Sequence, residues 1–227
     1  MIYEIIATGS KGNAVLINNK VLIDCGVPFK AIEPYLHQIQ LVLLTHEHGD
    51  HFKPSTVTMM AKLRPAIRWG CCQWMVQKLI DAGVPATQID LYKPSKWSVY
   101  GSLKVMPEEL HHNVQNCGYH IEHNGEKLFY ATDTGDLDGI KAKDYDLYLI
   151  EANHTKLEIT QKILEKLKSG EYAYEYKAAE NHLSREQATD WLLENVGPDS
   201  EFQFLHQHKG GLDDGSNIQE DIPIVLD

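Results

Sequence analysis

The sequence predicts an αββα sandwich, in which two mixed β-sheets face each other and helices cover their outer sides. Short runs rich in Val, Ile and Leu dominate the first half of the chain, while apolar runs alternate with helical patterns in the second half. With 227 residues and 43% hydrophobic composition, the chain can bury a full-sized core. Because no linker, repeat or low-complexity stretch divides it, we expect residues 1–227 to form a single domain.

Several apolar segments between Gly, Asn and Pro residues have the length and composition of strands. In the first half these are residues 2–7, 13–19, 20–26 and 41–46. Later, "CGYHIEHNGEKLFYATD" shows alternating apolar residues on both sides of Asn124-Gly125, a dipeptide typical of a type I′ hairpin. Residues 146–153 and 201–208 add two further strands.

Three segments carry signals for the start or the end of a helix. Residues 54–64 begin with Pro54, which suits a first helical turn. In residues 155–170, Thr155 and Glu158 form a capping-box pattern and Gly170 is a stop signal. In residues 184–197, Ser184, Gln187 and Gly197 repeat this arrangement.

Charge and hydropathy indicate which kinds of function and which cellular location the sequence favours. The formal net charge of −11 argues against indiscriminate affinity for nucleic acid. However, residues 52–100 carry seven Lys or Arg against two Asp, a local charge of +5, which suits either an anionic substrate or a solvated helix face. The chain has no apolar run of the roughly 20 residues that span a membrane, no signal-peptide pattern and no C-x-x-C pair among its four cysteines. We therefore expect reduced thiols and a cytoplasmic protein.

The stretch "LVLLTHEHGDH" places four metal-ligand side chains directly after an apolar strand. His46, His48, Asp50 and His51 follow the pattern H-x-H-x-D-H. Solvated histidines on a loop would explain one or two of them, but four at this spacing indicate a metal site. His46 and His48 can face one point while Asp50 and His51 face a second point nearby. Because each of two ions needs about four ligands, further donors must come from downstream.

Three later positions offer His or Asp near the expected end of a strand. The first is His111 or His112 in "ELHHNVQNCGY". The second is Asp133 in "FYATDTGDL", and the third is His206 or His208 in "FQFLHQH". The carboxyl ends of strands are where open α/β folds usually place their sites, so these residues are candidates for the missing ligands.

With these ligands in this order, the sequence resembles the metallo-β-lactamase superfamily. Within it, "GSKGNA", "LIDCG", "HHNVQNCGY", "ATDTG", "EANH" and "NHLSREQA" resemble the branch of ribonuclease Z and bacterial 5′-exonucleases, including phage-encoded relatives. The resemblance implies two metal ions. It assigns His46, His48 and His112 to one ion, assigns Asp50, His51 and His206 to the other, and makes Asp133 a bridge between them.

Two of these assignments choose between neighbouring histidines. His112 is preferred to His111 because the third histidine of the family precedes a Gly-Tyr pair by six residues, as His112 precedes Gly118-Tyr119. His206 is preferred to His208 because it directly ends its strand.

The same resemblance points to catalytic groups. We expect Asp50, Glu151 and His182 to serve in catalysis, with His182 protonating the leaving oxygen and Glu151 orienting its imidazole. Asp24 in "LIDCG" is expected to hold a metal-bound histidine through its other ring nitrogen. Gly9 to Gly12 are expected to form a turn between strands rather than a phosphate cradle. Residues 170–181 are interpreted as either a lid over the substrate or a contact in a homo-oligomer.

These features together predict a dinuclear metal-dependent hydrolase, a phosphodiesterase acting on a small nucleotide or nucleic acid through a hydroxide held between the ions. The expected ions are zinc, with manganese or iron as alternatives. The acidic chain favours a substrate of few phosphates whose hydrolysis depends weakly on salt. The alternatives are hydrolysis of a thioester, lactone or lactam on the same metal site, or a non-catalytic binding module.

Overall fold

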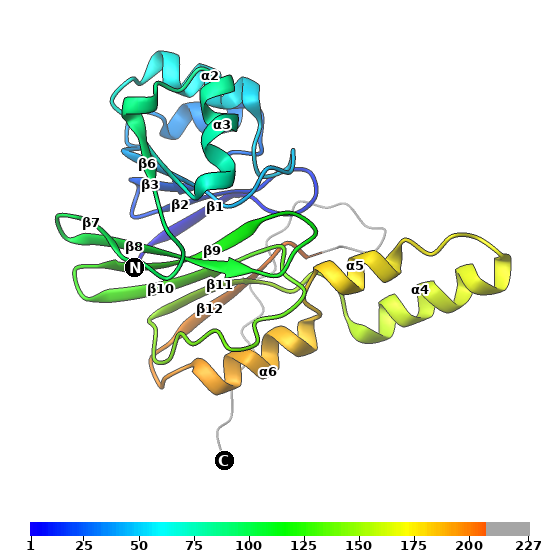
Figure 1. Cartoon of the computed structure of the whole chain (residues 1–227). Coiled ribbons are helices and arrows are strands. Elements are labelled where there is room, and N and C mark those ends of the chain that lie inside the picture. The colour runs from blue at the N-terminus through cyan, green and yellow to red at the C-terminus, as the bar shows by residue number, and fades with distance from the viewer. Residues whose placement is uncertain (208–227) are drawn as a thin grey trace.

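The computed structural model describes residues 1–207, which form two six-stranded sheets stacked face to face (Figure 1). Both sheets mix parallel and antiparallel strands. The predicted αββα arrangement is confirmed. His208, the alternative to His206 as a ligand, lies outside the described residues.

The first sheet contains the strands of the N-terminal half in simple chain order. Two antiparallel pairings join its first three strands, and parallel pairings join the remaining ones. Its members are β1 (Tyr3–Ala7), β2 (Ala14–Ile17), β3 (Val21–Ile23), β4 (Leu41–Leu44), β5 (Arg68–Cys71) and β6 (Ile89–Leu91). All four residues of β4 are buried, as expected of a strand with helices on one side and a second sheet on the other.

The second sheet is built in the reverse order, from β12 at one edge to β7 at the other. Its strands are β7 (Ser98–Tyr100), β8 (Leu103–Leu110), β9 (Asn116–His123), β10 (Glu126–Ala131), β11 (Leu147–Glu151) and β12 (Glu201–Leu205). The predicted hairpin between β9 and β10 is present, and Asn124 and Gly125 both have the positive φ, 54° and 90°, that a type I′ turn requires. The pairings from β10 to β11 and from β11 to β12 are parallel.

The three predicted helices are present. They are α2 (Pro54–Leu63), α4 (Lys156–Ser169) and α6 (Arg185–Asn195). Both capping boxes form, and Gly170 ends α4 in the left-handed conformation with φ of 74°. One detail of the prediction was wrong, since α6 ends at Asn195 with Val196 as its cap rather than at Gly197. Gly197 instead packs against Asp144, where an added Cβ would lie 3.0 Å from a carboxylate oxygen.

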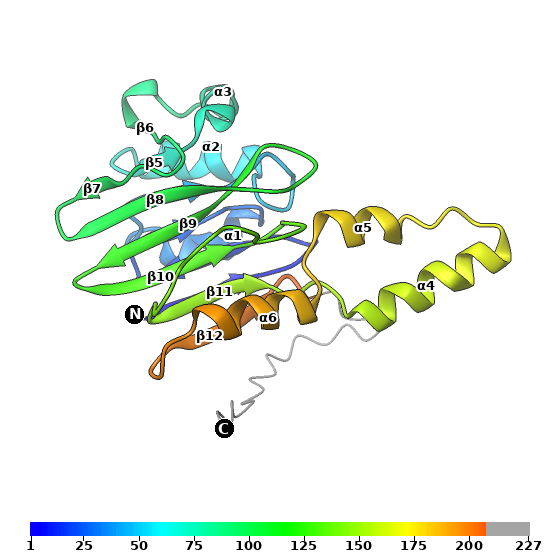
Figure 2. The ribbon, with the colours of Figure 1, turned by 60° about the horizontal axis from the view of Figure 1, so that its bottom comes forward.

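Several elements had no clear signal in the sequence. They include the short helices α1 (Phe29–Ile32) and η1 (Glu33–Tyr35), the helix α3 (Gln73–Asp81), the turn η2 (Ala86–Gln88) and the strands β5 to β8. Residues 170–181, whose role was left open, contain α5 (Glu175–Asn181). Together α4 and α5 form an arm that projects away from the sheets (Figure 2).

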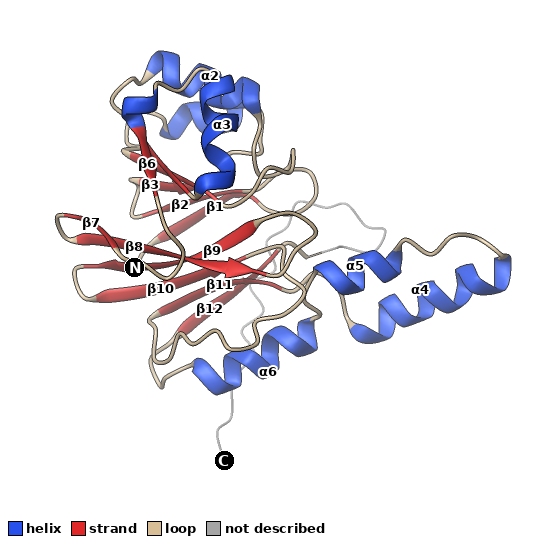
Figure 3. Ribbon diagram, viewed as in Figure 1, coloured by secondary structure: helices blue, strands red, loops and turns tan. Residues whose placement is uncertain are grey.

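The helices and the two sheets form four layers (Figure 3), and three apolar clusters lie between them. One lies between the first sheet and α1 to α3, one between the two sheets, and one between the second sheet and α6. Burial of this apolar surface fixes the position of one sheet relative to the other. As a result, one edge of the sandwich brings together the ends of β4, β8, β10, β11 and β12. Among the described residues, no helix combines the length and hydropathy needed to cross a membrane.

Candidate metal centre

Three imidazole rings converge where β4 and β8 end. His46 and His48 follow β4, and His112 lies two residues beyond the end of β8. The Nδ1 atom of His48 lies 3.1 Å from Nε2 of His46 and 3.3 Å from Nε2 of His112. A tetrahedral ion with bonds of about 2.0 to 2.1 Å would space its nitrogen ligands by roughly 3.3 to 3.4 Å. The three nitrogens therefore already have the spacing of metal ligands.

Hydrogen bonds to Nδ1, the ring nitrogen on the side away from the cluster, hold two of these rings in the tautomer that a metal requires. His112 donates from Nδ1 to the carbonyl of Asn181 over 3.1 Å, and Nδ1 of His46 lies 3.0 Å from the Thr45 hydroxyl. In each ring the Nε2 lone pair is then left facing the other imidazoles. His112, and not His111, enters the cluster, because the His111 ring turns outward and pairs with Asp136 at 2.8 Å.

His51 is oriented by the carboxylate that the sequence singled out. Its Nδ1 lies 2.7 Å from Oδ2 of Asp24, whose other oxygen accepts the Thr45 backbone N–H over 2.9 Å. The opposite ring nitrogen, Nε2, lies 2.9 Å from Oδ2 of Asp133. Asp24 therefore contacts the His51 ring on the side away from Asp133 and belongs to none of the groups with metal-ligand spacing among the described residues.

Asp133 lies between the two groups of histidines. Its Oδ2 atom lies 3.3 Å from Nε2 of His46 as well as 2.9 Å from Nε2 of His51. Its other oxygen, Oδ1, contacts Nδ1 of His206. Asp133 thus contacts members of both predicted ligand sets, as a bridging carboxylate must.

Backbone strain accompanies this placement. Asp24, Asp133 and His206 each follow the end of a strand and have positive φ values of 59°, 58° and 50°. Such values are uncommon for residues other than glycine, and they persist where the surroundings over-determine them. His206 is held by its N–H bond to the Thr8 hydroxyl, at 2.7 Å, and by its carbonyl, which accepts from Asn153 at 3.2 Å.

Two buried atoms of this cluster make no hydrogen bond in spite of their contact. These are Oδ1 of Asp133 and Nδ1 of His206, in residues that are only 2% and 5% exposed. Buried polar atoms normally find a partner, and two such atoms that face each other without hydrogen-bond geometry suit ligands of a shared cation. The donor set therefore fits metal ions.

Nine side chains form three overlapping groups with metal-ligand spacing, and Asp133 belongs to all of them. Within each group the ligand atoms lie within 4.8 Å of one another. The groups are His46, His48, His112 and Asp133; Asp50, His51 and Asp133; and Asp133, Glu151, His182 and His206. The first group equals the predicted ligand set of one ion. The second and third divide the predicted set of the other ion, with His206 beside Glu151 and His182.

Glu151, which is buried, and His182, which is partly exposed, form a pair beside this cluster. Nδ1 of His182 lies 3.0 Å from Oε2 of Glu151 and 3.8 Å from Oδ1 of Asp133. The other Glu151 oxygen accepts backbone N–H bonds from Thr134 and Leu183, at 2.6 and 3.1 Å. Since Glu151 is fully buried and held at both oxygens, it fixes the His182 ring beside the candidate metal centre.

Burial and neighbouring charges lower the pKa of two of these histidines and raise the pKa of two others. Burial lowers the pKa of His46 and lowers that of His112 to about 4, which keeps both rings neutral and able to bind metal. Burial also acts to lower the pKa of His51 and of His182. The carboxylates of Asp133 and Asp24 outweigh it at His51, and Glu151 outweighs it at His182, so both pKa values are raised.

Two glycines allow the close backbone approaches that complete the site. A Cβ on Gly26, next to β3, would lie 1.8 Å from the carbonyl oxygen of Asp50. A Cβ on Gly135 would lie 2.1 Å from the carbonyl oxygen of Glu180, at the end of the arm. A larger residue at Gly26 would push away the loop that carries Asp50, and one at Gly135 would push the loop that carries Asp133 away from the arm.

Sequence reasoning missed two polar residues that support the cluster. The Asn13 amide nitrogen lies 2.8 Å from Nε2 of His51 and 3.2 Å from the Asp50 carbonyl. Asn116 donates to the carbonyls of Thr132 and Asp133 at 3.0 and 2.7 Å. Both lie inside quoted motifs, "GSKGNA" and "HHNVQNCGY", but Asn carries no metal-ligand signal by itself. The segment from Gly9 to Gly12 forms a turn, as expected, with a 2.9 Å bond from the N–H of Gly12 to the carbonyl of Gly9.

Comparison with known proteins agrees with this geometry. A family model described as a beta-lactamase superfamily domain matches residues 19–199. Exodeoxyribonuclease WalJ of Streptococcus pneumoniae is 27% identical over 244 aligned positions, which cover 96% of this chain and 84% of that protein. Exodeoxyribonuclease YycJ of Bacillus anthracis is 26% identical over 189 positions, which cover 77% of this chain and 68% of that protein.

Solved structures show the same fold at lower identity. The metallo-beta-lactamase fold protein YhfI from Bacillus subtilis aligns with a TM-score of 0.69 and 15% identity, covering 90% of this chain and 85% of that one. The short form of human tRNase Z aligns with a TM-score of 0.64 and 16% identity, covering 91% of this chain and 93% of that one.

Proposed function

Since the chain belongs to the β-lactamase superfamily, we propose that it is a dinuclear metal-dependent phosphodiesterase that acts at the end of a nucleic acid or on a small nucleotide. The observation that carries the proposal is the convergence of the other six predicted ligands around Asp133, with the Glu151–His182 pair beside them. The ligands alone fit hydrolysis in general. The Glu151–His182 pair is what favours phosphodiesters over acyl substrates.

We assign His46, His48 and His112 to one ion, assign Asp50, His51 and His206 to the other, and make Asp133 the bridge. Two bound divalent ions would supply an activated water and offset the charge of the phosphoryl oxygens. Zinc is the proposed metal because histidines predominate, with manganese and iron as alternatives because carboxylates take part. Asp50, half-buried beside Asp133, completes the donor set on the side that faces substrate.

His182 is the proposed proton donor to the leaving oxygen. Its Nδ1 is engaged by Glu151, so Nε2 is the ring atom available to substrate. Expulsion of an alkoxide at neutral pH needs a proton, and a charged imidazole held by a carboxylate can provide it. A thioester or lactam hydrolase would have no evident use for this pair.

The nature of the substrate follows from the named relatives together with the charge pattern. The two relatives are exodeoxyribonucleases, which suggests DNA as the substrate. Two of the cations in residues 52–100 are neutralised within the chain, Lys78 by Glu47 and Arg68 by Asp90. An enzyme that binds only the end of a DNA strand would contact few phosphates. Such an enzyme needs few cations, so a DNA substrate is compatible with a net charge of −11.

The test is a substrate panel with defined metals. We expect hydrolysis of thymidine 5′-monophosphate p-nitrophenyl ester and release of nucleotides from DNA ends, with little loss between about 50 and 200 mM salt. Acyl substrates should stay intact. Hydrolysis of thioesters or lactams without any phosphodiester cleavage would refute the proposal, and a steep salt dependence would show that many phosphates are bound along the chain.

We also propose a cytoplasmic location. All four cysteines are buried and unpaired, as is usual for proteins in a reducing compartment. An oligomer contact through residues 170–181 stays a prediction, which sedimentation of the purified protein would test.

A further inference from the structure

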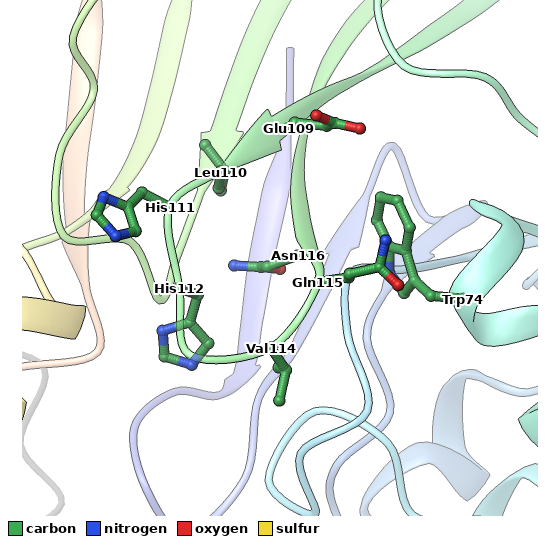
Figure 4. Close-up of a pocket in the computed structure, with 8 residues that line it drawn as sticks. All are labelled: Trp74, Glu109, Leu110, His111, His112, Val114, Gln115 and Asn116. Atoms are coloured by element: carbon green, nitrogen blue, oxygen red, sulfur yellow. The ribbon is translucent and has the colours of Figure 1, made fainter.

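A cavity of about 270 Å³ opens beside His112, on the side of that ring away from the arm (Figure 4). Its lining comes from α3, the end of β8, the following loop and the start of β9. The lining residues are Trp74, Glu109, Leu110, His111, His112, Val114, Gln115 and Asn116. Because His112 belongs both to this cavity and to the candidate metal centre, whatever fills the cavity lies next to the reacting phosphate.

Trp74 gives the cavity a rigid aromatic wall. Its indole N–H donates to the carbonyl of Thr45 over 3.0 Å, and the side chain packs against two of the apolar clusters. Thr45 directly precedes His46, so the hydrogen bond ties the ring to the metal-binding loop. An aromatic ring held in this way is preorganised for stacking, because little rotamer freedom remains to be lost.

The polar groups of the cavity include no permanently charged cation. None of the lining residues is Lys or Arg, and Glu109 contributes a carboxylate. Asn116 is 2% exposed, and its side-chain oxygen is buried without a hydrogen-bond partner among the described residues. Gln115, which is exposed, adds a second amide to the same lining as Trp74. This lining disfavours a phosphate and favours a flat, uncharged group that carries hydrogen-bond donors.

We propose that this cavity binds the nucleobase of the nucleotide adjoining the scissile phosphate, stacked on Trp74 and contacted by Gln115. The cavity lies just below the roughly 300 to 1,000 Å³ of pockets for drug-sized ligands, which suits one ring system rather than a longer segment. Stacking recognises every base through its π-face, so the site selects nucleotides over simple phosphodiesters and not one base over another. This inference rests on the proposed phosphodiesterase function and names its substrate class more closely.

Two substrates with the same scissile bond test the cavity by kinetics. They are thymidine 5′-monophosphate p-nitrophenyl ester and its abasic counterpart, in which hydrogen replaces the base. We expect Trp74→Leu to lower kcat/KM on the base-carrying ester about tenfold and to change it by under about twofold on the abasic ester. Gln115→Ala, at an exposed loop position, should show the same selectivity with a smaller loss.

Trp97, which is 44% exposed and does not line the cavity, provides the matched control. Trp97→Leu should behave as wild type on both esters. Equal losses on both esters in Trp74→Leu, or no loss in either cavity variant, would overturn the inference. Gln115→Ala keeps the test valid if Trp74→Leu fails to fold.

A binding measurement separates this inference from the proposed function. Thymidine 5′-monophosphate should quench the tryptophan fluorescence of the metal-loaded protein saturably, and deoxyribose 5-phosphate should not. Quenching should be lost in Trp74→Leu and kept in Trp97→Leu. If neither ester is cleaved but this quenching pattern holds, then the base site stands and the proposed function fails. If cleavage occurs and quenching persists in Trp74→Leu, then the base site fails alone.

Discussion

The two sheets contribute to the candidate metal centre in opposite ways. The first sheet supplies His46, His48, Asp50 and His51 from one loop after β4. The second sheet supplies single residues, His112, Asp133 and His206, that follow β8, β10 and β12. Four proposed ligands from one loop can be recognised in the sequence without any knowledge of the fold. The three proposed ligands of the second half come together only because three strands end at the same edge.

Two of the candidate ligands, one from each half, are held in different ways. A side chain orients the His51 ring, because Asp24 lies 2.7 Å from its Nδ1. A backbone carbonyl orients the His112 ring, because Asn181 accepts from its Nδ1 at 3.1 Å. Side-chain support can be removed by one substitution, whereas backbone support depends on where the arm packs. This difference makes the following experiments informative.

The largest effect should come from the residue that contacts both halves. Asp133→Asn replaces a charged bridging oxygen by a neutral amide, so metal content should fall from about two ions per chain to one or fewer. Activity should fall by more than the roughly 10- to 100-fold typical of losing an orienting partner. Elemental analysis after reconstitution measures the first effect, and steady-state kinetics measure the second.

Asp136→Asn is the matched control, because Asp136 is a nearby carboxylate that pairs with His111 outside the cluster. It should retain both ions. Two ions bound in Asp133→Asn would remove the bridging assignment.

His182→Ala should lower turnover by about 100-fold or more while leaving metal content unchanged, since loss of a general acid typically costs 10²- to 10⁴-fold. A p-nitrophenyl ester needs little protonation of its leaving group, so the loss should be much smaller on it than on DNA. His37→Ala, at an exposed position outside both the cluster and the cavity, should resemble wild type. Equal losses on both substrates would contradict proton donation and indicate a positioning role.

Asp24→Asn should weaken metal binding at the His51 position by roughly 10- to 100-fold and leave the His46–His48–His112 position nearly unaffected. The reason is that Asp24 contacts the His51 ring directly but reaches the three converging rings only indirectly, through the Thr45 hydroxyl that contacts His46. Titration with a chelator, followed through metal release, would resolve two affinities. A parallel weakening of both positions would show that the two halves are not held independently.

The smallest effect concerns a buried histidine away from the site. His120 on β9 is 2% exposed, stacks on Phe129 at 4.7 Å and lies 3.1 Å from the Tyr145 hydroxyl. Burial lowers its pKa to about 4, below the usual value of about 6.5. As pH falls below 6.5 the unfolded chain takes up a proton that the folded chain refuses, so stability is lost between about pH 6.5 and pH 4.

The free energy of unfolding should therefore fall by about 1 kcal/mol more in wild type than in His120→Gln between pH 7.5 and 5.5. Urea unfolding of both metal-free proteins measures the difference. An identical pH dependence would show that His120 takes up its proton in the folded state.

Much of the fold could be predicted because local signals agree with the tertiary structure. The capping boxes at Thr155 and Ser184 and the turn at Asn124-Gly125 act within a few residues, and all three are present. The strands β5 to β8 gave no such signal. For example, β8 contains Pro107 and two adjacent glutamates, and its pairing with β9 holds it in the sheet.

The sequence by itself determined the fold class and the cluster from His46 to His51, because ligands on one loop and residues in one helical turn interact at short range. The resemblance already favoured His112 over His111, but only the tertiary structure supplies the physical reason, because the β8–β9 loop turns the His112 ring toward the carbonyl of Asn181, far away in the chain. It also decided that Asn13 and Trp74 stand beside the metal centre. The physical reason is that burial of the core between the two sheets sets where the strand ends meet, and no local pattern of residues encodes that meeting point.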